Sequence, residues 1–136
     1  MKKVLILAGL IVGAGCTRTN VALLDQSLRP PQTCEEGILM YTSPARAPSG
    51  YVELALLNSS GSTAFTSEAG MMKSQRQKAA EIGATGIILG GIDEPGAGAK
   101  VAGAFLGTGT ERKGKAVAIL APADTSKVYG ICRQHR

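Results

Sequence analysis

The apolar positions along the chain come in short runs, and polar segments that contain glycine or proline separate them. Such runs predict strands, and they fall at residues 37–42, 51–57, 85–89 and 116–121. In the second run Val52, Leu54 and Leu56 alternate with Glu53 and Ala55, which predicts one buried and one exposed face before a turn at residues 58–61. A looser alternation over residues 96–105 predicts one more, weak strand, and a polar turn is expected at residues 107–115.

The clearest helix is predicted from Ser67 to Ile82. Thr66 or Ser67 can cap its first turn, and Gly83 can take the left-handed conformation that ends a helix. The side chains expected on its buried side are Met72, Ala79 and Ile82, with Met71 and Ala80 at the margins. This order of elements predicts an α+β fold, with one helix packed on a small, mostly antiparallel sheet of four to five strands.

The N-terminal segment differs from the rest because a basic start, Lys2-Lys3, precedes an apolar run over residues 4–12 that is broken only by Ala8 and Gly9. The run is shorter than the about 20 residues that cross a bilayer, so a signal sequence is favoured over a membrane helix. The following Gly13-Ala14-Gly15-Cys16 resembles the lipobox of bacterial lipoproteins, which implies that Cys16 is lipidated and becomes the new N-terminus. The alternative is an ordinary secretory signal that is cut elsewhere, with Cys16 incidental.

We therefore expect residues 1–15 to be a signal peptide, residues 16–36 to be a lipidated cysteine and tether, and residues 37–136 to form a single domain. The tether is expected because residues 17–31 show no sustained period and end in Arg29-Pro30-Pro31, a stiff extended element. Its function would be to hold the domain away from the bilayer surface.

Export would also determine the oxidation state of the three cysteines and the class of partner that the chain can meet. If Cys16 carries lipid, Cys34 and Cys132 remain as an even pair in an oxidising compartment, which favours one disulfide over the alternative of two free buried thiols. The net charge of +5 is modest, and the few aromatic residues do not alternate with basic ones. A nucleic-acid partner is therefore not expected.

Candidate catalytic, cofactor and metal-binding chemistry is weak. Residues 109–115 match the spacing of a phosphate-binding loop, but Ala116 replaces the Ser or Thr that binds magnesium, and a strand rather than a helix is expected to follow. We therefore interpret this segment as a solvated turn. The alternative is that Arg112, Lys113 and Lys115 contact anionic lipid headgroups or cell-wall polymer. The single histidine, His135, is penultimate, and the acidic pairs Glu35-Glu36 and Asp93-Glu94 are expected to be solvated loop charge. No catalytic, cofactor or metal site is predicted.

One stretch shows a resemblance to a known kind of domain. Residues 78–89, Lys-Ala-Ala-Glu-Ile-Gly-Ala-Thr-Gly-Ile-Ile-Leu, resemble the helix-to-strand junction of bacterial envelope proteins of the Rcs stress-sensor lipoprotein type and of the related YbjQ-like heavy-metal-binding domains. The resemblance implies a compact α/β domain, which in the sensor is stapled by disulfides and reports envelope damage to an inner-membrane partner. Neither signalling nor metal binding is carried over, because this chain lacks the sensor's further cysteines and any Cys or His cluster.

The leading hypothesis is a membrane-anchored envelope lipoprotein with a non-enzymatic binding or interaction domain. Its partners would be the membrane, through the lipid anchor, and an envelope protein or cell-wall component. Thr17 after the cysteine, by resemblance to sorted lipoproteins, favours the periplasmic face of the outer membrane. The alternative hypothesis is a small-molecule or metal-ion binding module of the envelope.

Overall fold

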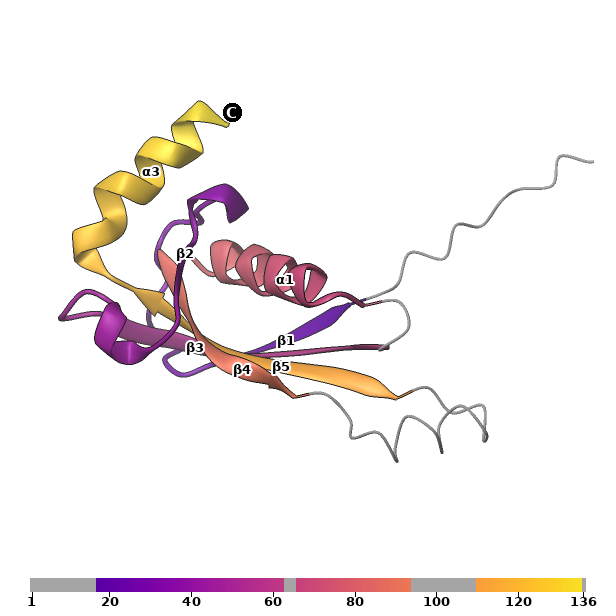
Figure 1. Ribbon diagram of the computed structural model, residues 1–136. Helices are drawn as coiled ribbons and strands as arrows, with labels where there is room; N and C mark the ends of the chain where they lie inside the picture. The colour runs from indigo at the N-terminus through magenta and orange to yellow at the C-terminus, as the bar shows by residue number, and fades with distance from the viewer. Residues whose placement is uncertain (1–16, 63–65, 94–109, 136) are drawn as a thin grey trace, which may run out of the picture.

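The computed structural model describes residues 17–62, 66–93 and 110–135. These residues form a sheet with α1 lying across one face and α3 beyond one end of the strands (Figure 1). The strands are β1 (Arg18–Leu23), β2 (Leu39–Tyr41), β3 (Val52–Ser62), β4 (Gly86–Asp93) and β5 (Glu111–Leu120). The helices are α1 (Glu68–Glu81) and α3 (Thr125–Gln134), with short 3-10 turns η1 (Glu35–Gly37), η2 (Pro44–Arg46) and η3 (Pro122–Asp124).

The five strands lie in the order β1-β3-β5-β4-β2, and every pair is antiparallel except β2 with β4. The parallel pair is possible because the chain passes through β3 and α1 between these two strands, which gives the long crossover that parallel pairing needs. This arrangement confirms the predicted α+β fold with a mostly antiparallel sheet. None of the described helices is long and apolar enough to cross a membrane.

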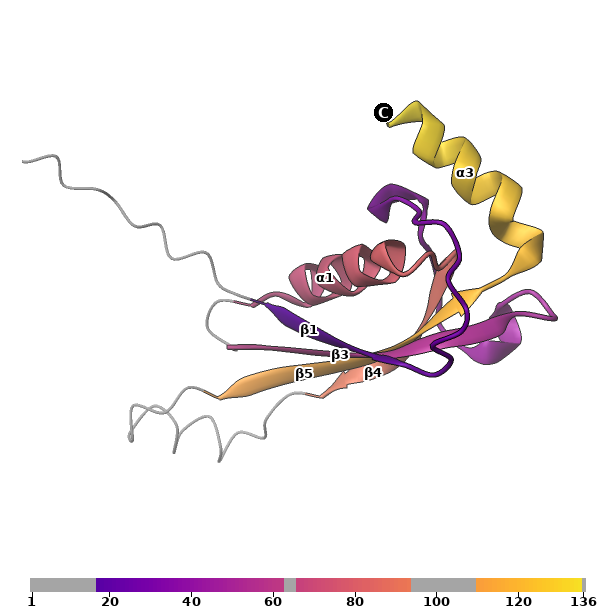
Figure 2. The same cartoon turned by 180° about the vertical axis from the view of Figure 1, so that it is seen from behind.

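The hydrophobic core lies between α1 and the sheet. Its members are mostly small: Ile38, Leu54, Ala55, Leu57, Ala79, Ala80, Ala84, Ile87, Ala116 and Ala118. Alanines on both surfaces let the helix approach the strands closely, but each buries little apolar area. The other face of the sheet has no helix over it among the described residues (Figure 2), and we call it the open face.

Helix α1 begins and ends where the sequence predicts. The Ser67 hydroxyl accepts a hydrogen bond from the Gly70 amide at 3.0 Å, and Gly83 has a φ of 79° directly after the helix. The predicted buried side is correct for Ala79 and wrong for the first half of the helix, where Met71 and Gln75 are buried and Met72 is only half-buried. Gln75 takes a core position that the apolar pattern could not indicate.

The expected tether is wrong for Arg18–Leu23, because these residues form β1 at the edge of the sheet. The Thr19 hydroxyl is buried and lies 2.9 Å from the Ser59 hydroxyl of β3 and 2.6 Å from the Ser74 hydroxyl of α1. Val21 and Leu23 pack against the core. The strand was missed because one of its three inward residues is polar, and its pairing partner lies about 40 residues away.

Three other strands are longer than predicted, and one of them is β4, which continues past residue 89 to Asp93. The residues expected to turn at 58–61 continue β3, where Asn58 pairs with Lys115 of β5. The turn expected at 107–115 is likewise wrong from Glu111 onward, because β5 begins there. In both segments polar side chains occupy the outward positions of a strand whose one face is exposed to solvent. The amino-acid sequence of such a strand resembles that of a loop. The weak strand predicted for residues 96–105 lies outside the described residues.

An irregular register at the start of β3 changes which of its side chains are buried. The pairing with β5 shifts between Glu53 and Ala55, so Leu54 and Ala55 are both buried, whereas Val52 and Leu56 are 44% and 43% exposed. The simple alternation predicted for this strand is therefore wrong.

The sequence prediction also missed α3. After β5, Pro122 ends the sheet as expected, and η3 leads directly into the helix. Val128 of α3 is fully buried. The Tyr41 hydroxyl of β2 donates a hydrogen bond of 2.5 Å to the carboxylate of Asp124, the residue that precedes α3. Burial and this bond raise the pKa of Tyr41 to about 12, so its hydroxyl stays protonated and continues to donate.

The hydroxyl cluster of Thr19, Ser59 and Ser74 gives a test of the β1 placement. We predict that Thr19→Val lowers the free energy of unfolding by about 1 kcal/mol, because two hydroxyls lose a partner under α1. Thr42→Val is the matched control, since the Thr42 side chain is exposed. Urea denaturation of both variants measures the effect, and equal midpoints would contradict the buried position of Thr19.

Candidate functional site

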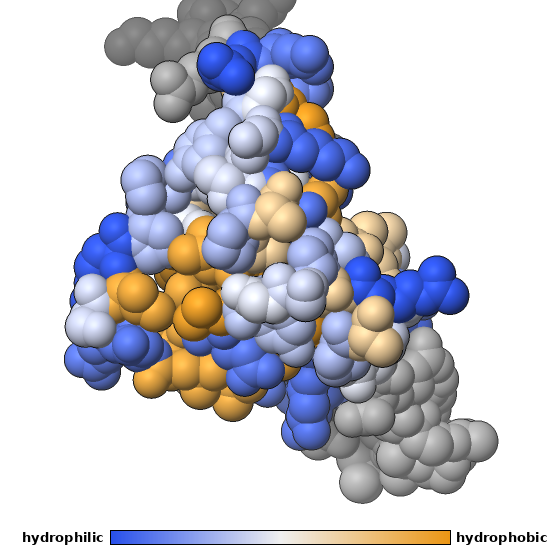
Figure 3. Space-filling model, turned by 90° about the vertical axis from the view of Figure 1, so that its left-hand side faces the viewer, coloured by the Kyte–Doolittle hydropathy of each residue, from blue (hydrophilic) through white to orange (hydrophobic). Residues whose placement is uncertain are grey.

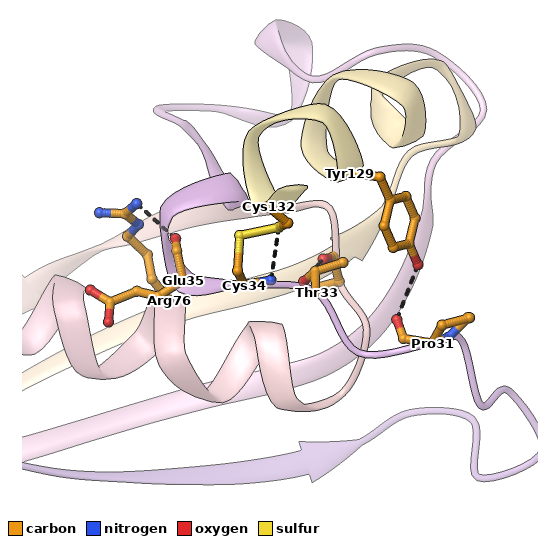
Figure 4. The surroundings of a disulfide bond; sticks show 8 residues. Pro31, Thr33, Cys34, Glu35, Arg76, Tyr129 and Cys132 are labelled. Carbon is orange, nitrogen blue, oxygen red and sulfur yellow. Dashed lines mark hydrogen bonds between the residues drawn. A yellow bond between two sulfur atoms is a disulfide. The ribbon is translucent and has the colours of Figure 1, made fainter. Parts of the chain in front are cut away.

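A disulfide joins two parts of the chain that are far apart in sequence. Cys34 directly precedes η1, Cys132 lies near the end of α3, and their sulfurs are bonded at 2.04 Å across a sequence separation of 98 (Figure 4). The structure therefore confirms the pairing expected from the parity of the cysteines. Both residues are half-buried.

The segment that carries Cys34 is hydrogen-bonded to the later part of α1 and the turn after it. The Thr33 amide donates to the Ala80 carbonyl at 3.1 Å, and the Thr33 hydroxyl donates to the Ala84 carbonyl at 2.8 Å. The Arg76 guanidinium donates to the Glu35 carbonyl at 2.7 Å. The Thr33 amide and the Glu35 carbonyl are backbone groups of the segment, so these two bonds do not depend on its side chains.

On its other side the same segment contacts α3. The Tyr129 hydroxyl donates to the Pro31 carbonyl at 3.3 Å, and the Cys34 amide donates to the Cys132 sulfur at 3.1 Å. Gly37 allows the close approach, since a Cβ there would lie 2.8 Å from that sulfur and 3.0 Å from Val128. Residues 31–37 thus form a layer between α1 and α3 (Figure 4), and the disulfide fixes α3 to it.

The other residues singled out in the sequence lie in several different parts of the chain. Cys16 lies outside the described residues, and Thr17 follows it at the start of the described chain. His135 is exposed just after α3, three residues beyond Cys132, and Glu35 lies in η1, next to Cys34. Lys115 lies within β5, so the segment with phosphate-loop spacing is extended strand from Glu111 and does not run into a helix.

Among the described residues, no group of three or more His, Cys, Asp or Glu side chains could hold a metal ion. Asp93 ends β4, and its neighbour Glu94 lies outside the described residues.

A hollow of about 230 Å³ opens beside the end of α1, between β1 and the loop that follows it; we call it the Leu54 hollow. Five of its lining residues are apolar (Leu23, Leu28, Leu54, Pro30 and Ile82), three are charged (Asp25, Arg29 and Glu81), and Gln32 is polar. The Ser27 hydroxyl and amide both donate to the Asp25 carboxylate, which lowers the pKa of Asp25 and keeps it charged. The sequence prediction missed this hollow because it assigned residues 23–32 to a tether.

Exposed apolar side chains continue around this end of the molecule. Leu24 is 50% exposed, Leu28 is 37% exposed, and Val52 lies at the start of β3 on the same side. Figure 3, which views the end of the molecule away from residue 17, shows apolar surface interrupted by blue, hydrophilic side chains. Apolar surface with a charged border is typical of contact sites for other proteins.

The open face carries a second hollow, of about 200 Å³, at the opposite end of the strands. Except for one glycine, its lining residues have polar or charged side chains: Asn20, Asn58, Ser59, Ser60, Glu111, Lys113, Gly114 and Lys115. The two hollows differ in chemistry, so one partner would not suit both.

Comparison of the chain with models of protein families, with curated proteins and with solved structures finds no match in any of the three.

The disulfide can be tested through stability. In the chain-entropy view, closing a loop of this length contributes at most about 4.7 kcal/mol, and native-state strain lowers that figure. We predict that Cys132→Ser melts several degrees below the wild type, and that a reductant lowers the wild type to the same temperature. Thermal denaturation followed by circular dichroism measures both. The reductant should not affect Cys132→Ser, and a wild type insensitive to reductant would contradict the stabilising role.

Proposed function

We propose that this chain is an envelope lipoprotein, anchored by acyl groups on Cys16, whose α+β domain is a non-enzymatic interaction module. The observation that carries the proposal is the disulfide between Cys34 and Cys132. Disulfides persist in oxidising compartments outside the cytosol, which agrees with the signal-like N-terminal segment. The lipobox-like Gly13-Ala14-Gly15-Cys16 adds the anchor.

The position of β1 supports a domain held close to the membrane. Only Thr17 separates Cys16 from Arg18, the first residue of the strand. Two residues of extended chain span at most about 7 Å, so an acylated Cys16 would hold this end of the sheet next to the headgroups. In a host with two membranes, Thr17 after the cysteine supports the periplasmic face of the outer membrane.

The Leu54 hollow supports an interaction with another envelope component. Its volume of about 230 Å³ is below the about 300–1000 Å³ that pockets for small molecules usually have. A hollow of this size accepts one or two apolar side chains of a protein partner, and Asp25, Arg29 and Glu81 offer charges of both signs beside it. It lies at the end of the strands away from Arg18, so it would stay accessible in the anchored molecule.

The anchor is tested by replacing Cys16. We predict that Cys16→Ser leaves the membrane fraction or accumulates unprocessed, because the two or three acyl chains that hold a lipoprotein durably are lost. Cys132→Ser is the matched control, since it also exchanges one cysteine for serine but keeps the anchor. Membrane fractionation with intact-mass measurement checks both variants. A Cys16→Ser protein that stays wholly in membranes at the wild-type processed mass would contradict the proposal.

A further inference from the structure

Three cationic side chains lie near one another on the open face. Arg18 of β1 pairs in register with Ser60 of β3, which pairs with Lys113 of β5. Lys115 lies two residues along β5 and therefore points to the same face as Lys113. We call Arg18, Lys113 and Lys115 the basic strip; all three residues are exposed.

The orientation of the basic strip follows from its neighbours along the strands. Thr19 follows Arg18 on β1, and Ser59 precedes Ser60 on β3. Both are buried: the Thr19 hydroxyl is hydrogen-bonded to the Ser59 hydroxyl and to the Ser74 hydroxyl of α1. Successive side chains of a strand point to opposite faces, so Arg18, Ser60 and Lys113 point away from α1. The basic strip is thus on the side of the sheet that no described helix covers.

The surroundings of the basic strip suit an anionic oxygen-rich surface. Two acidic residues lie beside these cations: Glu111 lines the polar hollow, and Asp93 of β4 pairs in register with Lys113. The three cations of the basic strip outnumber them. The amides of Asn20 and Asn58 line the same hollow and provide further hydrogen-bond donors.

The chain leading to the anchor ends beside the basic strip. Arg18 is two residues from Cys16, about 7 Å at full extension, and Lys113 is two strand spacings from Arg18, about 10 Å. The Debye length at physiological ionic strength is about 8 Å. Arg18 would therefore lie within one Debye length of an anchored Cys16, and Lys113 and Lys115 would come within that range of the headgroups when the open face lies against the membrane.

We propose that the open face docks on the anionic phospholipid headgroups of the membrane that holds Cys16, with Arg18, Lys113 and Lys115 as the contacting cations. This inference rests on the proposed lipid anchor. Docking turns α1 away from the bilayer and leaves the Leu54 hollow at the far end of the strands open to a partner. The basic strip thereby sets the orientation of the domain, which the anchor alone leaves free.

The test uses the lipidated full chain reconstituted in two kinds of vesicle, one of phosphatidylcholine and one that also contains about 30% phosphatidylglycerol. An amine-reactive label followed by peptide mass spectrometry reports the accessibility of each lysine. We expect labelling of Lys113 and Lys115 to fall about threefold or more in the anionic vesicles, and about 0.5 M salt to restore it. Lys73 and Lys127 are the internal controls, since they are exposed on α1 and α3.

Equal labelling of Lys113 in both kinds of vesicle, with the protein still floating with them, would overturn the docking and leave the anchor intact. A similar fall produced by inorganic phosphate with neutral vesicles would overturn it as well, because the site would then bind a free anion. A wild-type protein that floats with neither vesicle would overturn the anchor, and the docking with it.

Discussion

The covalent bond between Cys34 and Cys132 is the constraint on which this small domain depends most. Six of the ten core residues are alanine, so the packing of α1 on the sheet buries little apolar area for a chain of this length. Helix α3 adds one fully buried side chain, Val128, and the segment before η1 is held by a few hydrogen bonds of Pro31 and Thr33. The disulfide joins these two weakly packed parts and thereby holds α3 against the rest of the domain.

The same bond connects the fold to the proposed location of the protein. Small domains with limited cores are commonly stabilised by disulfides when they are exported. In the account given above, the two ends of the sheet then have different functions. The end that begins with Arg18 lies near Cys16 and carries the basic strip, and the other end carries the Leu54 hollow and exposed leucines.

Local sequence signals predicted the elements that obey them. The serine cap, Gly83 and the apolar run after it gave α1 and the start of β4 correctly, and the parity of the cysteines gave the disulfide. The failures have a common physical cause, which is polar residues in paired or buried positions. Thr19 and Gln75 are polar residues that tertiary contacts bury, and Asn58 and Lys115 are polar residues on the solvent-exposed face of the sheet. Their positions therefore cannot be predicted from the hydrophobic pattern.

The binding surfaces were harder to predict than the fold for the same reason. The Leu54 hollow is built from residues 23–32 together with Leu54 and Ile82, and only the pairing of β1 with β3 brings these parts together. The basic residues at 112–115 were noticed as a cluster, but their grouping with Arg18 depends on register across three strands. Arg112 instead donates to the Thr66 carbonyl, so the cluster in sequence is not the cluster in space.

The central claim is that the chain is exported, acylated at Cys16 and closed by one disulfide. Its most direct test is the intact mass of the protein extracted from membranes without reductant. The account predicts the mass of residues 16–136 plus the acyl groups of a lipoprotein, less two hydrogens that return on reduction. A membrane-extracted protein that retains residues 1–15 and has three free thiols would contradict it.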